Sequence, residues 1–165
     1  TVTLEDEIDI SRGDMIVHAE VETGRKGVEA GTDLDAMVVW MSEQSFVAGK
    51  SYWFKQTTRV VAGSMSELVH AVDVNTLEHR PAQKLMLNEV GRVVLALSRS
   101  VVFDPYTVNP ATGAFIIIDR LTNSTVGAGM ILGRHDTGNR ARGRVSQQEK
   151  ERRDRKSPRL TSVPQ

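Results

Sequence analysis

Two glycine-rich segments are the places where this sequence could hold a phosphate group. Residues 49–51 (GKS) match the end of a phosphate-binding loop, but Gln44 stands where that motif requires its first glycine. The residues after Ser51 predict a strand, whereas phosphate binding uses the N–H groups at the start of a helix. Residues 127–133 (GAGMILG) miss a dinucleotide-binding fingerprint by one residue. Both segments are interpreted as turn or strand glycines, so we predict no cofactor-binding residue in this chain.

The histidines and carboxylates form no catalytic or metal-binding pattern. His18, His70, His79 and His135 make no HxxxH or HExxH arrangement, and the sequence contains no Cys. No serine lies in the GxSxG motif of a nucleophile elbow, and the acidic residues at positions 5–9 suit a solvated strand face better than a cation site. We therefore expect no catalytic residue and no metal site, and we interpret His70 as a hydrogen-bonded core or rim residue.

The elements that position these residues are predicted to be strands. Short apolar runs are separated by Gly, Asn, Asp or Pro. The first run has no polar face, which places Trp40 in the interior, whereas Trp53 alternates with polar residues. No long amphipathic helix precedes residue 134, so the pattern favours an all-β fold, an antiparallel Greek-key β-barrel closed without free strand edges. The predicted strands cover residues 35–41, 51–61, 68–74, 92–99, 114–119 and 125–132.

Composition divides the 165 residues into four parts. We assign residues 1–19 to the last strands of a preceding β-barrel, 20–33 to a linker, 34–133 to the main barrel and 134–165 to a basic tail. The tail holds ten Lys or Arg and four Asp or Glu, a net charge of +6, whereas residues 1–133 hold eleven and seventeen, a net charge of −6. Because the tail has only four apolar residues, we expect it to be disordered when isolated.

Several short segments spread over residues 1–131 resemble one protein family. They are TLEDEIDISRGD at 3–14, DVNTLE at 73–78, LNEVG at 87–91, FDPY at 103–106, TGAFIIIDRLTN at 112–123 and TVGAGMI at 125–131. The last segment alone is similar to the closing strand of the third domain of elongation factor Tu and indicates only the translation-factor GTPase superfamily. Together the segments resemble the end of domain 2 and the whole of domain 3 of the large, GTP-binding subunit of bacterial sulfate adenylyltransferase. Residues 144–153 resemble the lead-in to the adenylylsulfate kinase domain that is fused to this subunit in some bacteria.

The resemblance implies a part in sulfate assimilation. The parent complex would use GTP, ATP and Mg²⁺: the large subunit hydrolyses GTP in an N-terminal P-loop domain, and a small catalytic subunit joins ATP and sulfate into adenylyl sulfate and pyrophosphate. The GTP-binding residues of the family lie upstream of the matched region. We therefore expect a piece of the parent subunit that is inactive alone, located in the cytoplasm, without a membrane segment.

The resemblance also implies that the barrel contacts its own N-terminal GTPase domain and the small catalytic subunit. Polar residues inside the family-like segments are the candidate contact residues: Asp73, Asn75, Thr76, Asp104, Tyr106 and Arg120. An ordinary turn or rim hydrogen bond is an equally good explanation for each of them. The alternative function is a translation-factor-like barrel that binds RNA with the help of its basic tail. The tail has no aromatic residue to stack on bases, which makes nucleic acid a weaker expectation than a linker.

Overall fold

The computed structural model describes residue 3 and residues 5–16, 28–73 and 76–136. Most of the predicted linker and nearly all of the basic tail lie outside the described residues. Within the described part of the chain, no helix is long and apolar enough to cross a membrane.

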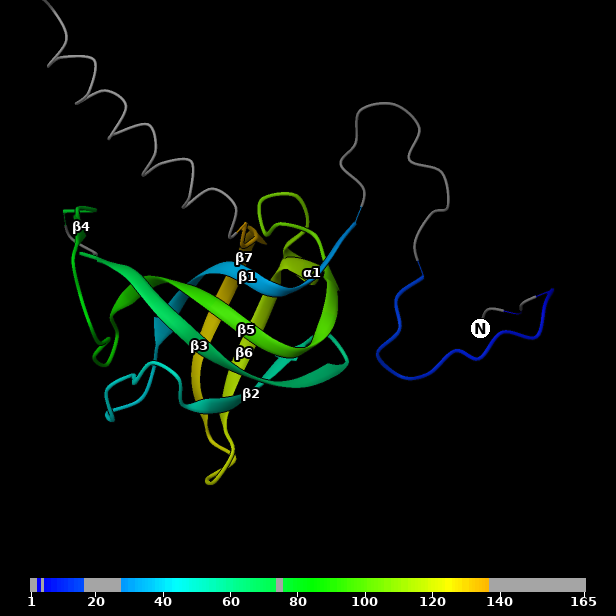
Figure 1. Cartoon of the computed structure of the whole chain (residues 1–165), viewed down its shortest axis with the longest axis horizontal. Helices are drawn as coiled ribbons and strands as arrows, with labels where there is room; N and C mark the ends of the chain where they lie inside the picture. The colour runs from blue at the N-terminus through cyan, green and yellow to red at the C-terminus, as the bar shows by residue number, and fades with distance from the viewer. Residues whose placement is uncertain (1–2, 4, 17–27, 74–75, 137–165) are drawn as a thin grey trace, which may run out of the picture. The chain divides into compact units, whose positions relative to one another are not determined.

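Six antiparallel strands form a closed barrel (Figure 1). Hydrogen-bonded neighbours follow the order β2-β6-β7-β1-β5-β3, and β2 also pairs with β3, which closes the sheet. A two-residue strand, β4 (His79–Arg80), extends the far end of β3, and the single helical turn α1 (Pro110–Gly113) precedes β6. The predicted all-β Greek-key barrel is therefore confirmed. The barrel strands are β1 (Glu29–Trp40), β2 (Ser51–Gln56), β3 (Arg59–Val72), β5 (Val90–Phe103), β6 (Ala114–Asp119) and β7 (Thr125–Arg134).

Several strand boundaries differ from the predicted ones. The strands β3 and β5 are longer than the predicted strands over 68–74 and 92–99. The predicted strand over 51–61 is broken by a tight turn at Thr57 and Thr58, so it supplies all of β2 and the start of β3. Thr57 has a φ of 50°, which β-branched residues seldom adopt, so its residue type gives no signal for a turn. The first strand begins at Glu29, before the predicted barrel boundary at residue 34.

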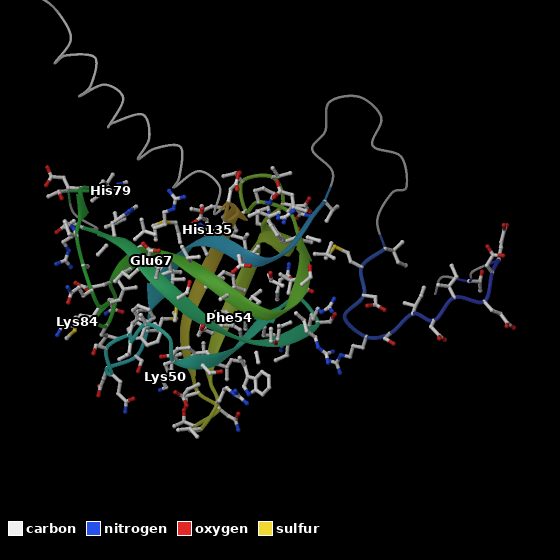
Figure 2. All side chains as sticks on the ribbon, in the orientation of Figure 1. Lys50, Phe54, Glu67, His79, Lys84 and His135 are labelled. Carbon is white, nitrogen blue, oxygen red and sulfur yellow. The ribbon has the colours of Figure 1, made fainter. Side chains whose placement is uncertain are left out.

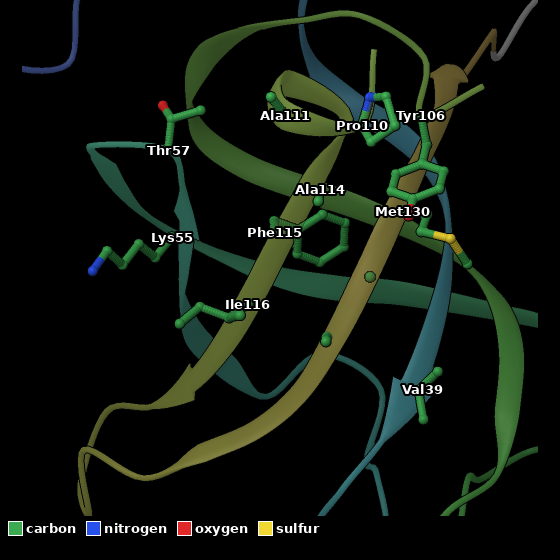
Figure 3. Close-up of a pocket in the computed structure, with 12 residues that line it drawn as sticks. Val39, Lys55, Thr57, Tyr106, Pro110, Ala111, Ala114, Phe115, Ile116 and Met130 are labelled. Atoms are coloured by element: carbon green, nitrogen blue, oxygen red, sulfur yellow. The ribbon is translucent and has the colours of Figure 1, made fainter. Parts of the chain in front are cut away.

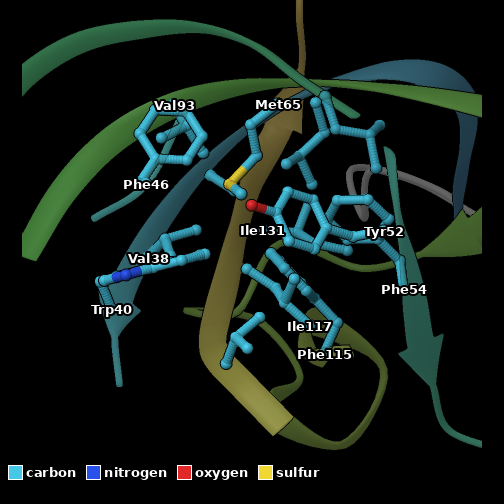
Figure 4. Close-up of a cluster of buried hydrophobic side chains, with 14 of the residues drawn as sticks. Val38, Trp40, Phe46, Tyr52, Phe54, Met65, Val93, Phe115, Ile117 and Ile131 are labelled. Atoms are coloured by element: carbon cyan, nitrogen blue, oxygen red, sulfur yellow. The ribbon is translucent and has the colours of Figure 1, made fainter. Parts of the chain in front are cut away.

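The interior of the barrel is filled by large apolar side chains from every barrel strand (Figure 4). Trp40 is buried as predicted, with 2% of its surface exposed, and its ring meets Phe46 and Tyr52 edge-on at 5.7 and 5.9 Å between centroids. The indole N–H donates to the backbone oxygen of Gln44 over 2.7 Å, which satisfies the polar atom of the ring. Burial of these rings is the main contribution to the stability of the barrel.

Glycine in β7 makes room for these side chains. The strand β6 places Phe115 opposite Gly129 in β7, and the ring lies across the glycine backbone. A Cβ atom at position 129 would overlap the Phe115 ring, so only glycine fits there. Two positions earlier in β7, a Cβ atom on Gly127 would lie 3.0 Å from the backbone oxygen of Val39. Both glycines therefore lie where a neighbouring group approaches the strand closely.

We predict that Gly129→Ala destabilises the barrel by about 1–3 kcal/mol, because the added methyl group displaces Phe115 from a filled core. Ala128→Ser, which changes the neighbouring side chain on the outer face, is the control and should cost less than about 0.5 kcal/mol. Urea unfolding of the two variants measures both values. Equal stability of Gly129→Ala and the parent chain would show that Phe115 does not pack on this glycine.

Candidate docking surface

The candidate contact residues Asp73 and Thr76 belong to the turn between β3 and β4. The carboxylate of Asp73 accepts a hydrogen bond from the backbone N–H of Thr76 over 3.1 Å, and the hydroxyl of Thr76 accepts one from the N–H of Glu78 over 3.3 Å. Asn75 lies outside the described residues. Both described residues thus stabilise their own turn, which is the simpler of the two explanations that the sequence allowed.

Asp104 and Tyr106 shape the loop that leads into α1. The carboxylate of Asp104 accepts hydrogen bonds from the hydroxyl of Thr112 over 2.8 Å and from the side-chain amide of Asn109 over 3.3 Å. The backbone N–H of Tyr106 donates to the oxygen of Ile131 over 2.8 Å, which fastens the loop to β7. Asp104 therefore acts within the loop, whereas Tyr106 is held beside the outer face of the barrel.

Arg120 lies in the hairpin between β6 and β7, at the lowest point of Figure 1. Its guanidinium carbon is 4.6 Å from the centre of the Trp53 ring, and its NH1 group donates to the hydroxyl of Ser51 over 3.0 Å. The loop of Tyr106 and this hairpin stand at opposite ends of β6, and the turn of Asp73 follows the far end of β3. The candidate residues therefore occupy three separate loops and do not converge on one site.

An apolar groove of about 650 Å³ lies on the outside of the barrel (Figure 3). Outward-facing residues of three neighbouring strands meet there, because Ile116 of β6 and Val39 of β1 both pair in register with Ala128 of β7. The small side chains of Ala114 and Ala128 leave a hollow between larger ones. The remaining lining comes from Met130, from the end of β2 and the turn after it, and from Tyr106 and the start of α1. Most of the lining is apolar, and Lys55 and Thr57 are polar members of it.

The outer surface of the neighbouring strands β1, β5 and β3 carries charged side chains that pair with one another. Arg92 of β5 donates to Asp35 of β1 over 3.0 Å, and the Nδ1 atom of His135 lies 3.2 Å from the same carboxylate. His70 stacks on His79 with ring centres 4.1 Å apart, and its side chain is half-buried. Burial, followed by the positive neighbours His79 and Arg92, lowers the pKa of His70. Because these charges compensate one another, this face offers less than the groove to a partner.

A buried carboxylate fixes the hairpin that carries Arg120. Asp119 accepts hydrogen bonds from the backbone N–H groups of Leu121 and Thr122 over 2.8 and 3.1 Å, and from the ammonium group of Lys50 over 2.7 Å. The hydrogen bond from Lys50, followed by those of the two backbone groups, lowers the pKa of Asp119 to about 2. The same interaction raises the pKa of Lys50. Figure 2 shows Lys50 at this end of the barrel, away from His79.

We predict that Asp119→Asn lowers the melting temperature at pH 7. A carboxyl group with a depressed pKa stabilises the fold above its ordinary pKa near 4 and loses this contribution as the pH falls through its folded value of about 2. The gap between parent and variant should therefore shrink as the pH falls from about 4 to about 2. Circular dichroism melts over this range measure it, with the exposed Glu43→Gln as control. A gap of constant size would mean that the ionised form of Asp119 is not the stabilising one.

The sequence features considered for metal and phosphate binding can be located in the structure. Among them, no three His, Asp or Glu side chains stand close enough together to hold a metal ion. Lys50 and Ser51 continue from a turn into β2 instead of a helix, and residues 127–133 lie in β7, so neither segment provides a helix N-terminus for phosphate. The groove was missed from the sequence because its residues alternate with core residues on the same strands. The small residues at positions 114 and 128, on the outer register of apolar strands, were the available signal.

Comparisons with known proteins agree with this architecture. The family model described as GTP-eEF1A C-terminal domain-like matches residues 33–132. A solved structure of Sup35 complexed with GDP shares the fold, with a TM-score of 0.60 and 21% identity over 68% of this chain and 28% of that one.

Two curated relatives are similar over most of the chain. The bifunctional enzyme CysN/CysC of Rhodopirellula baltica is 51% identical over 140 residues, which are 84% of this chain and 21% of that protein. Sulfate adenylyltransferase subunit 1 of Pseudoalteromonas atlantica is 52% identical over 132 residues, which are 80% of this chain and 27% of that protein. The chain thus spans about a quarter of the length of these relatives. It belongs to the GTP-eEF1A C-terminal domain-like family, in the branch that includes subunit 1 of sulfate adenylyltransferase.

Proposed function

We propose that this chain is the barrel module of a sulfate adenylyltransferase GTPase subunit and that it works by docking, not by chemistry. The observation that carries the proposal is the mainly apolar groove around Ala128 on the outside of the barrel. In the parent complex, ATP and sulfate would be converted to adenylyl sulfate and pyrophosphate in the cytoplasm, driven by GTP hydrolysis. The barrel would transmit the nucleotide state as a rigid body.

The occupant that we propose for the groove is the GTP-binding domain of the same polypeptide. An apolar hollow suits a permanent contact, because permanent interfaces are more apolar than transient ones and resemble a divided core. The relatives are long enough to contain such a domain, because the chain covers only 21–27% of their length. Tyr106 and Met130 would supply the larger contact areas at the α1 end of the groove, where they lie beside each other (Figure 3).

The alternative of an RNA-binding barrel has less support. Among the described cations, Lys50, Arg80 and Arg92 are each paired with a carboxylate, which reduces the number open to phosphate groups. The basic residues that motivate this alternative lie mostly in the tail, outside the described residues. The salt dependence of RNA affinity remains its test.

We predict that Ala128→Arg in the full-length subunit reduces GTP-dependent adenylyl sulfate formation by at least about tenfold, because a charge without a partner would be buried in the docked state. Ser98→Arg, on an exposed part of β5, is the matched control and should leave the rate nearly unchanged. The measurement is pyrophosphate release in the presence of the small subunit, with and without GTP.

A second variant, Ile116→Ser, tests the groove independently, in case Ala128→Arg fails to fold. It removes apolar contact area from the groove without adding a charge. Melting temperatures of both variants report on the fold itself. If both variants fold and retain the full GTP-dependent rate, the groove is not the docking site.

A further inference from the structure

The outer face of β2, β6 and β7, which carries the groove, is called the apolar face. The side chain of Arg120 is held in one orientation at the hairpin end of this face. Its guanidinium group lies over the Trp53 ring at 4.6 Å and donates a hydrogen bond to Ser51 over 3.0 Å. The hairpin beneath it is fixed in turn by the hydrogen bonds that Asp119 accepts from Leu121, Thr122 and Lys50. An arginine held in this way loses little side-chain entropy when it binds another group.

The charge of Arg120 has no carboxylate partner among the described residues, in contrast to several other cations of the barrel. Lys50 is paired with Asp119, and the arginines at positions 80 and 92 are also paired with carboxylates. A guanidinium group has five N–H donors, and Arg120 uses one of its nitrogens for Ser51. The remaining donors form a planar fork that matches a carboxylate in bidentate geometry.

The surroundings of Arg120 are apolar rather than polar. Trp53 pairs in register with Ile118 on one side and with Ala62 on the other, and all three side chains are half-buried. The next residue, Leu121, has 88% of its surface exposed at the tip of the hairpin. A rigid Arg–Trp pair beside exposed apolar groups has the composition of a binding hot spot between proteins. A nucleic acid would instead require a continuous track of phosphate contacts.

We infer that Trp53 and Arg120 form an anchor that binds an Asp or Glu side chain of the small subunit of sulfate adenylyltransferase. The inference rests on the proposed function, because that function supplies the partner. The charge favours a separate chain over a tethered domain, since complementary charges accelerate the encounter of molecules that must find each other. Lys55 and Arg59, which follow Trp53 along the chain, also have no carboxylate partner among the described residues and add to the positive potential near the anchor.

The test measures the affinity of the purified small subunit for the full-length large subunit at several salt concentrations. Arg120→Glu should weaken binding by at least about tenfold, because the new carboxylate would face the carboxylate of the small subunit and repel it. Arg120→Lys should weaken it less, because lysine keeps the charge but lacks the planar fork. Arg134→Glu reverses an exposed arginine at the other end of β7 from the Arg120 hairpin and should change the affinity by less than about twofold. Loss of the anchor should also make binding less sensitive to salt.

A cross-linking experiment identifies the occupant directly. Leu121 is replaced by the photoreactive residue p-benzoylphenylalanine in the full-length subunit, and the complex is irradiated and analysed by mass spectrometry. The inference requires cross-links to the small subunit; cross-links confined to the large subunit's own domains, or to copurified RNA, would overturn it. Unchanged affinity of a folded Arg120→Glu variant would overturn it too, while leaving the groove intact as a docking site. Failure of the unaltered subunits to associate would contradict the proposed function as well.

Discussion

The ring of Phe115 lies across the backbone of Gly129 inside the barrel, where β6 and β7 pair. The glycine lets a large ring fill the interior where β6 and β7 approach each other. On the outer side of the same two strands, Ala114 and Ala128 are too small to cover the surface, which leaves the groove. Because successive side chains of a strand point to opposite faces, the same strands place large side chains in the core and small ones in the groove.

The two ends of β6 carry the features that distinguish the apolar face. At one end, the loop stabilised by Asp104 holds Tyr106 beside the groove. At the other, the buried carboxylate of Asp119 fixes the hairpin that presents Arg120 on Trp53. At both ends, the carboxylate satisfies backbone or neighbouring side-chain donors. Their common effect is to hold a few exposed side chains rigidly, as a recognition surface requires.

Much of this fold could be predicted from the sequence, and the candidate site could be predicted only in part. Alternating apolar runs indicated the strands, the buried position of Trp40 and the role of the β7 glycines. The turn at Thr57 was missed because a threonine with positive φ gives no local signal. Arg120 was among the candidates, but its contact with Trp53 joins residues 67 positions apart. Asp73 and Asp104, in contrast, accept hydrogen bonds from residues close to them in the sequence, so these contacts are of the kind that a sequence pattern can indicate.

The central claim is that the apolar face is covered by protein in the intact large subunit. Hydroxyl-radical footprinting of Met130 and Trp53 tests it most directly, by comparing the isolated chain with the full-length subunit and with the complex that contains the small subunit. The account predicts that Met130 is protected in the full-length subunit alone and that Trp53 gains protection when the small subunit binds. Equal labelling of both side chains in all three samples would contradict it.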